Sequence, residues 1–291
     1  MNEDAPNARA PRSRTAALVS LHAAVALFGF AGLFGKWIAL PPVTIVLGRT
    51  AVATIALGAL LALRGQGYGR YEWRLAASGA LLAAHWVAFF QSIQIAGVAI
   101  GLLGFATFPV FVLLLEWVFL RRRTHAVDWV LALIVTLGLV LLLPDFQLSN
   151  KVVQGVLWGV LAGATFALLT VCNRVYASRR EAGEIAFWQN AFAAVCLLPV
   201  LVLNPAIPAP RDLGLILVLG LACTALAHTL FIRSLRALSA HTASVVATME
   251  PVYGIALAAV LLGEFPNTAT LVGGVIIVAA ALWTTASAPR T

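Results

Sequence analysis

A glutamate and a proline stand side by side inside an apolar stretch, in ATMEPVYGIALAAVLLGEFPN at residues 247–267. An ionised carboxylate is costly in lipid and a proline removes a helix hydrogen bond, so neither is expected there without a role. Glu250 lies about nine residues into the apolar run 241–262, near the middle of a hydrocarbon core about 30 Å thick. It could exchange a proton near neutral pH, stay charged opposite a cation, or be a neutral structural carboxyl.

Arg49 is the arginine expected deepest inside an apolar run, where it follows Gly48. Such a side chain is too deep to be left unpaired, although its long stem can snorkel towards the interface. Two interpretations remain open, a structural arginine held by a fixed acceptor and an arginine that binds an anionic group of a substrate. Asn190 is its approximate counterpart later in the chain.

Aromatic residues and histidines form a second group of candidates. Trp86 and Phe89 belong to an aromatic stretch at residues 85–90, whereas the other tryptophans fall near predicted helix ends, as in an aromatic belt. Both side chains could stack on a substrate or pack in the core. His228, His22 and Tyr253 are further candidates: His228 as the counterpart of Trp86 in a repeat, His22 as a proton relay or a backbone partner, and Tyr253 as part of the Glu250 stretch.

Two prolines are expected to kink the helices that contain them. Pro251 cannot donate to the carbonyl of Ala247, and Pro109 has the same effect on Phe105. The freed carbonyls could face a cavity, or the kinks could have no part in binding.

The composition predicts a membrane protein. Of 291 residues, 62% are hydrophobic and 10% are charged, against about 25% charged in a soluble domain. A membrane helix needs about 20 apolar residues. The runs that meet this need are roughly 16–37, 42–63, 74–95, 98–119, 127–143, 153–174, 184–203, 212–233, 241–262 and 267–286. Residues 1–15 are expected to be a disordered cytoplasmic tail, and the first run to be a helix and not a removed signal peptide.

The net charge of +8 follows from the orientation in the membrane and does not indicate nucleic-acid binding. Most arginines fall at the ends of the runs that share a side with the N-terminus, while Lys36, Lys151 and Arg211 fall on the other side. The positive-inside rule then places both termini in the cytoplasm of a bacterial inner membrane.

Segments of the two halves of the chain resemble one another. An offset of 142 residues places FFQSIQ (89–94) over FIRSLR (231–236) and FPVF (108–111) over EPVY (250–253), and an offset of 138 places 27–38 over 165–176. These matches predict two five-helix repeats, 16–143 and 153–286. Because five is odd, the second repeat must enter the membrane from the opposite side, as in secondary transporters.

An arginine in the second run, a proline midway through the fourth and EPVYGIALAAVLLGE in the ninth together resemble the EamA-type drug/metabolite transporter superfamily. The resemblance covers roughly residues 16–286 and implies an all-α membrane protein with ten transmembrane helices in a five-plus-five inverted repeat. It implies a carrier for a small metabolite, with helices 1, 3, 4, 6, 8 and 9 around a central cavity and helices 5 and 10 at the periphery. In the first run LFGFAGLFGK replaces the family's usual opening, and this leaves the substrate class open.

We therefore expect a secondary active transporter of a small, amino-acid-like or other organic solute, working by alternating access, with export as the expected direction and protons as a candidate coupling ion. The sequence lacks the motifs of zinc peptidases, serine hydrolases and phosphate-binding loops, so neither an enzyme nor an ATP-driven pump is expected. No cofactor or metal is expected, since the histidines are scattered. The partners would be the substrate, the lipid bilayer and at most a second copy of the chain. A channel or a scaffold is the alternative.

Overall fold

The computed structural model describes residues 14–119, 121, 125–143, 147–203 and 205–287. Within these ranges the chain forms helices and no strand, so the all-α expectation is confirmed. Most of the tail expected at residues 1–15 lies outside the described residues, as do Arg122 and Arg123 of the predicted cytoplasmic arginines.

In the first half of the chain, the described residues form six helices. They are α1 (Arg14–Trp37), α2 (Pro42–Leu63), α3 (Trp73–Ala96), α4 (Val98–Phe105), α5 (Phe108–Phe119) and α6 (Ala126–Val140). α2 begins at Pro42, because proline at the first helical position has the right φ and lacks only an N–H that would have no partner there. α3 ends at Ala96 and is capped by Gly97, whose φ of 93° is readily adopted only by glycine.

In the second half, the part of the chain that the structure describes forms seven α-helices and one π-helix. They are α7 (Lys151–Ala177), α8 (Ala182–Leu203), α9 (Pro210–Gly220), η1 (Leu221–Leu226), α10 (Ala227–Ser234), α11 (Ala240–Ala247), α12 (Glu250–Leu262) and α13 (Thr268–Ser287). The side chain of Asn150 accepts from Val152 N at 2.9 Å, and Ser239 accepts from Thr242 N at 3.0 Å. These bonds cap the N-termini of α7 and α11.

Among the described residues, seven helical segments have the length and the apolar composition needed to cross a membrane. They are α1, α2, α3, α4 with α5, α7, α9 to α10, and α11 with α12. α6 (Ala126–Val140) and the stretch Thr268–Ala280 of α13 are shorter apolar helices. The ten-span count therefore stays a prediction.

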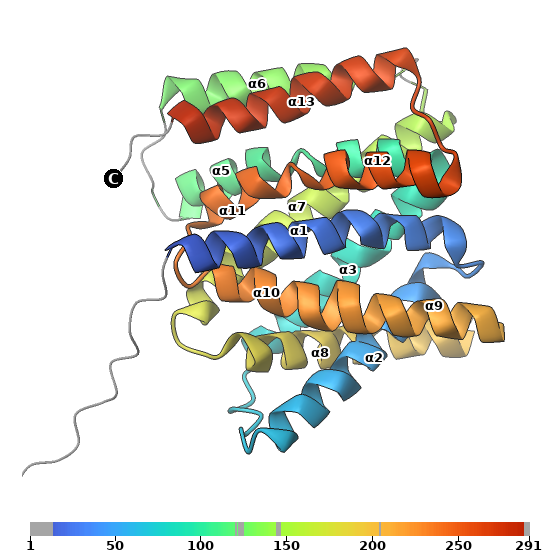
Figure 1. Ribbon diagram of the computed structural model, residues 1–291, viewed down its shortest axis with the longest axis vertical. Helices are drawn as coiled ribbons and strands as arrows, with labels where there is room; N and C mark the ends of the chain where they lie inside the picture. The colour runs from blue at the N-terminus through green and yellow to red at the C-terminus, as the bar shows by residue number, and fades with distance from the viewer. Residues whose placement is uncertain (1–13, 120, 122–124, 144–146, 204, 288–291) are drawn as a thin grey trace, which may run out of the picture.

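Figure 1 shows the arrangement of these helices. α1 lies in the middle, between α12 on one side and α10 on the other, and α6 and α13 lie side by side along one edge. α1 begins and α13 ends on the same side of the molecule. Across the two halves of the chain, α3 packs on α7 and α8, and α2 packs on α8 and α9.

Two of the long segments are interrupted just before a proline. α4 ends at Phe105 and α5 begins at Phe108, and α11 ends at Ala247 and α12 begins at Glu250. Pro109 and Pro251 are the second residues of the new helices, a position where the missing N–H costs little. Each interruption lies in the interior of the molecule, since Ala106, Thr107 and Thr248 are all buried.

Glycines allow two close crossings between the halves. A Cβ on Gly159 would lie 2.9 Å from the Cα of Gly104, at the contact of α7 with α4. A Cβ on Gly29 would lie 3.0 Å from the carbonyl oxygen of Glu250 and 3.0 Å from the nitrogen of Gly254, at the contact of α1 with α12. The second crossing holds the backbone of Glu250 directly against α1.

Candidate functional site

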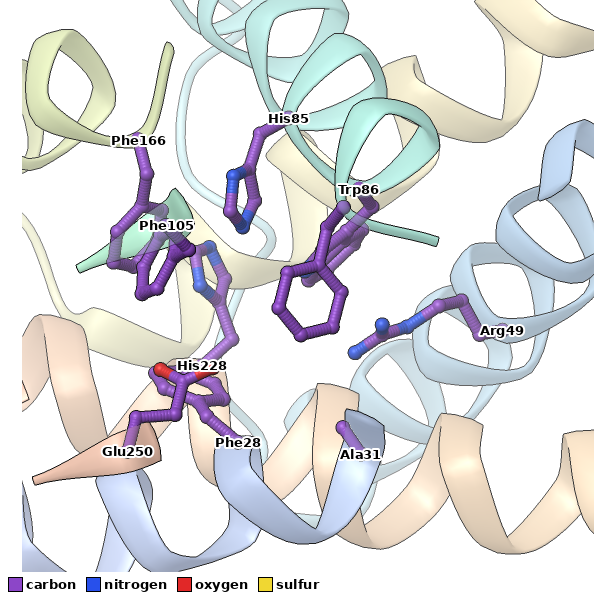
Figure 2. A pocket seen from close by; sticks show the side chains of 10 residues that line it. Phe28, Ala31, Arg49, His85, Trp86, Phe105, Phe166, His228 and Glu250 are labelled. Atoms are coloured by element: carbon purple, nitrogen blue, oxygen red, sulfur yellow. The ribbon is translucent and has the colours of Figure 1, made fainter. Parts of the chain in front are cut away.

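A small cavity lies where α1, α2, α3, α4, α7, α10 and α12 meet (Figure 2). Its lining consists of Phe28, Ala31, Arg49, His85, Trp86, Phe89, Phe105, Phe166, His228 and Glu250. None of these residues is more than 8% exposed. The volume open to the centre of a water molecule is about 20 Å³, enough for about one water. The site is therefore closed to bulk solvent in this conformation.

Arg49 reaches the cavity from α2 and is held on three sides. Its Nε donates to Thr224 Oγ1 at 2.7 Å and its Nη2 donates to the carbonyl of Cys223 at 2.9 Å. The guanidinium carbon lies 4.0 Å from the centre of the Trp86 ring, within the range of a cation–π interaction. Among the described residues, Nη1 has no hydrogen-bond partner. One donor group therefore stays available on the side of the cavity.

The acceptors for Arg49 come from the π-helix η1, which interrupts the segment between α9 and α10. A π turn closes with one more residue than an α turn, and such turns often occur at functional sites. The hydroxyl of Thr224 donates to the carbonyl of Leu219 at 2.8 Å, and this leaves its lone pairs for Arg49. The local departure from α-helical geometry thus presents a hydroxyl and a carbonyl to a buried guanidinium.

Glu250 is the first residue of α12 and is 3% exposed. Figure 2 shows Glu250 and Arg49 entering the cavity from opposite sides. No ion pair or hydrogen bond of the Glu250 carboxylate is present in the part of the chain that the structure describes. Its oxygens are therefore available to another group, which is unusual for a buried carboxylate.

The walls of the cavity are aromatic. The His85 ring stacks on Phe166 at 4.6 Å between ring centres, and the Trp86 ring meets His228 edge to face at 5.8 Å. Phe28 and Phe166 form an edge-to-face pair at 6.1 Å. These rings keep water away from Arg49 and Glu250, which strengthens electrostatic interactions inside the site.

His228 connects the cavity to a buried polar network that leads away from it. Its Nε2 lies 2.9 Å from Gln189 Oε1. The Gln189 amide nitrogen donates to Ser78 Oγ at 3.0 Å and to Asn173 Oδ1 at 2.6 Å. All four residues are buried, and the network joins α3, α7, α8 and α10 beside the cavity.

Five of the residues singled out in the sequence meet at this cavity, namely Glu250, Arg49, Trp86, Phe89 and His228. Two others do not. His22 lies on the exposed face of α1, and Tyr253 is half-buried on α12, one helical turn beyond Glu250. Neither residue belongs to the lining.

Five lining residues were not among the sequence candidates: His85, Phe28, Ala31, Phe105 and Phe166. The internal repeat contained a signal for two of them, because the offset of 138 pairs Phe28 with Phe166. Single phenylalanines in apolar helices carry no signal of their own, since most of them pack in cores.

The described residues contain no group of three histidine, cysteine, aspartate or glutamate side chains that could hold a metal ion. The chemistry available at the cavity is that of one guanidinium, one carboxylate and two imidazoles inside an aromatic wall.

Comparisons with known proteins identify the class to which this helical fold belongs. The sequence profile described as "EamA-like transporter family" matches residues 15–143 and again residues 153–286. The chain belongs to this family, and it is an integral, multi-pass membrane protein. The resemblance read from the ninth run is thereby confirmed.

Several relatives carry transporter names. The pseudopaline exporter CntI of Pseudomonas aeruginosa (strain UCBPP-PA14) is 30% identical over 84% of this chain and 86% of its own. An uncharacterised transporter, YwfM of Bacillus subtilis, is 27% identical over 72% of this chain and 75% of its own. The S-adenosylmethionine uptake transporter of Rickettsia felis is 30% identical over 60% of this chain and 58% of its own. A crystal structure aligns with a TM-score of 0.76 over 96% of this chain and all of the other, at 21% identity, and it shows the same fold.

Proposed function

We propose that this protein is a secondary active transporter that binds a small organic metabolite in the central cavity and moves it by alternating access. The observation that carries the proposal is the pair Arg49 and Glu250, which face one buried cavity and both retain unused hydrogen-bonding atoms. Buried charges in a membrane protein typically mark a substrate or ion pathway. Membership of a transporter family supports the same reading.

The transporter would consist of ten membrane helices in two inverted repeats of five, 16–143 and 153–286. Contacts between residues at equivalent positions of the two repeats support this topology. Phe28 touches Phe166, its counterpart at an offset of 138, and Trp86 touches His228, its counterpart at an offset of 142. Equivalent residues of two inverted halves touch one another only near the axis that relates the halves, so this axis would pass through the cavity. α6 and α13, the last helices of the two halves, pair at the periphery.

Transport requires the cavity to open, because about 20 Å³ holds about one water and no metabolite. The breaks before Pro109 and Pro251 and the π turn in η1 are places where helix halves could move separately. On one side of the molecule, an ion pair of 3.0 Å between Arg236 and Glu181 joins two loops. Near the other end of the segments, Glu264 accepts from Val98 N at 2.7 Å and ties α12 to the start of α4.

Protons are our candidate coupling ion and Glu250 is the candidate coupling residue. The charged and titratable groups that face it across the cavity are Arg49 from α2, His85 from α3 and His228 from α10. The charged carboxylate is tolerated in an open, hydrated state and costs more in a closed, dry one, so protonation can shift the balance between the two. We propose export, with both termini in the cytoplasm of a bacterial inner membrane and the chain acting as a monomer or homodimer.

The proposal is tested with purified protein in liposomes. A metabolite panel is first screened for compounds that raise the melting temperature, and each hit is then assayed for exchange of labelled for unlabelled compound. Trp86→Ala should abolish exchange, whereas Trp283→Ala, which removes an exposed tryptophan of α13, should leave it unchanged. Flux that neither saturates nor shows exchange would indicate a channel, and equal loss in both variants would contradict a site at this cavity.

A further inference from the structure

The hydrogen bonds around His85 determine which of its ring nitrogens faces the cavity as an acceptor. Its Nδ1 lies 2.9 Å from the carbonyl oxygen of Ala162. A carbonyl oxygen can only accept, so Nδ1 carries the proton and Nε2 keeps a lone pair. Within the described ranges Nε2 has no hydrogen-bond partner. Figure 2 shows the ring pointing from α3 into the cavity, towards His228.

The same reasoning applies to His228. The Gln189 amide nitrogen is engaged by Ser78 and Asn173, so its amide oxygen is turned towards His228 Nε2. Nε2 therefore donates, and Nδ1 is left as an acceptor. This Nδ1 is buried and without a partner among the residues described. A buried acceptor left without a donor is costly and calls for an explanation.

The polar groups of the cavity thus divide into two sets. His85 Nε2, His228 Nδ1 and the Glu250 carboxylate are acceptors, and they come from α3, α10 and α12. Arg49 Nη1 is a donor and comes from α2. Aromatic rings, among them Phe28 and Phe166, fill the space between. No protein donor in the described chain satisfies the three acceptors.

We infer that the substrate is a zwitterion whose primary ammonium group donates to Glu250, His85 and His228 and whose carboxylate is bound by Arg49. This inference rests on the proposed function and names the substrate class of the same site. An ammonium group has three N–H donors and one positive charge, which matches two neutral acceptors and one carboxylate. The surrounding rings favour a cation over a neutral group, and a guanidinium is the preferred partner of a carboxylate.

Other classes of solute fit less well. A dicarboxylate would place oxygen atoms against three acceptors, and an amine without a carboxylate would leave Arg49 Nη1 unused. A neutral nucleoside would leave Glu250 without a positive partner in a buried site. The acid and amine functions therefore both contribute to recognition.

The test uses the full-length purified protein and measures binding by isothermal titration and thermal shift. The probes are the twenty common L-amino acids, S-adenosylmethionine, the matching 2-hydroxy acids and the matching carboxamides. At least one amino acid should bind. Its 2-hydroxy acid and its carboxamide should each bind with an affinity at least roughly tenfold lower, because each analogue loses a charge-assisted contact. A 2-hydroxy acid that binds as tightly as its amino acid overturns the inference, as does a panel in which no free amino acid binds.

Two variants test where the ammonium group of the substrate binds. In His85→Leu and His228→Leu, the preference for the amino acid over its 2-hydroxy acid should shrink, while the preference over the carboxamide should persist. His22→Leu, which changes an exposed histidine of α1, is the matched control and should change neither ratio. If both preferences fall together in a folded variant, the histidines do not contact the ammonium group. Saturable exchange of a solute that lacks an ammonium group would refute the inference and leave the proposed function standing.

Discussion

Glu250 has no hydrogen-bonding partner in the described chain, and this makes its protonation sensitive to what enters the cavity. We expect Glu250→Gln, which keeps an acceptor oxygen but cannot ionise, to fold, to exchange substrate with roughly tenfold weaker affinity, and to lose the response of net transport to a pH gradient. The pH response is measured as net substrate flux in liposomes whose internal and external pH differ. Glu264→Gln is the control, because Glu264 lies at the end of α12 and binds a backbone N–H that an amide oxygen can also accept.

If net transport by Glu250→Gln keeps the wild-type dependence on pH, Glu250 is not the coupling residue and its carboxyl has a structural role. Glu250→Ala should weaken binding further than Glu250→Gln, because it also deletes the acceptor oxygen.

Arg49 serves the structure and the binding site at once. Nε and Nη2 are bound by Thr224 and Cys223, and the guanidinium lies over Trp86. We expect Arg49→Ala to lower the free energy of unfolding by roughly 2–5 kcal/mol, since it leaves the buried Cys223 carbonyl without its donor and opens a cavity beside Trp86. Arg49→Lys should recover little of this loss, because an ammonium cannot reproduce the planar, two-point contact.

The measurement for Arg49 is the melting temperature and yield of detergent-purified protein. Arg211→Ala, which removes an exposed arginine at the start of α9, should leave both unchanged. A stable Arg49→Ala protein with weakened substrate affinity would show that the residue acts only in binding.

At the scale of elements, the crossing of α4 with α7 depends on contact between glycine backbones. Gly159→Ala should destabilise the protein by about 1–3 kcal/mol, because the new methyl group would meet the backbone of Gly104 and the helices would have to separate. Gly214→Ala is the matched control: Gly214 is exposed on α9 with nothing within 4 Å of an added Cβ. This control should be neutral or slightly stabilising. Thermal unfolding of the two variants in parallel makes the comparison, and equal melting temperatures would contradict a tight crossing.

The helices also show which features of the fold can be predicted from the sequence. Apolar runs locate the helices to within a few residues, for example α2 at Pro42–Leu63 and α3 at Trp73–Ala96, because the bilayer sets their length. Prolines mark the places where α4 and α11 stop. The π turn of η1 has no comparable signal, since Leu-Ala-Cys-Thr-Ala-Leu is equally suited to an α-helix and tertiary contacts decide between the two. The partners of Arg49 in η1 were unpredictable for the same reason.

At the scale of the whole molecule, the two faces of the protein differ in charge. Arg180 contacts Glu72 at 2.6 Å, and Arg236 donates to the carbonyl of Arg180, so the loops that carry these arginines lie together. Asn150 and Asn267 begin helices that run from the opposite face. The positive-inside rule predicts that the arginine-bearing face is cytoplasmic.

Single cysteines in a background without Cys172, Cys196 and Cys223 test this orientation. An impermeant thiol reagent added outside intact cells should label positions near Asn150 and Asn267 and should miss positions near Arg70 and Arg180 until the membrane is opened. External labelling near Arg180 would overturn both the orientation and the cytoplasmic placement of the termini.

The π turn in η1 also has a consequence for changes in chain length. A π turn contains one residue more than an α turn, so removing one residue from Leu221–Leu226 would restore regular winding. The helices on either side would keep nearly the same orientation, because a π turn accommodates its extra residue locally. The deletion would, however, remove the local bulge that presents Thr224 Oγ1 and the Cys223 carbonyl to Arg49. The length of this six-residue segment is therefore under the same functional constraint as the identity of the residues in the site.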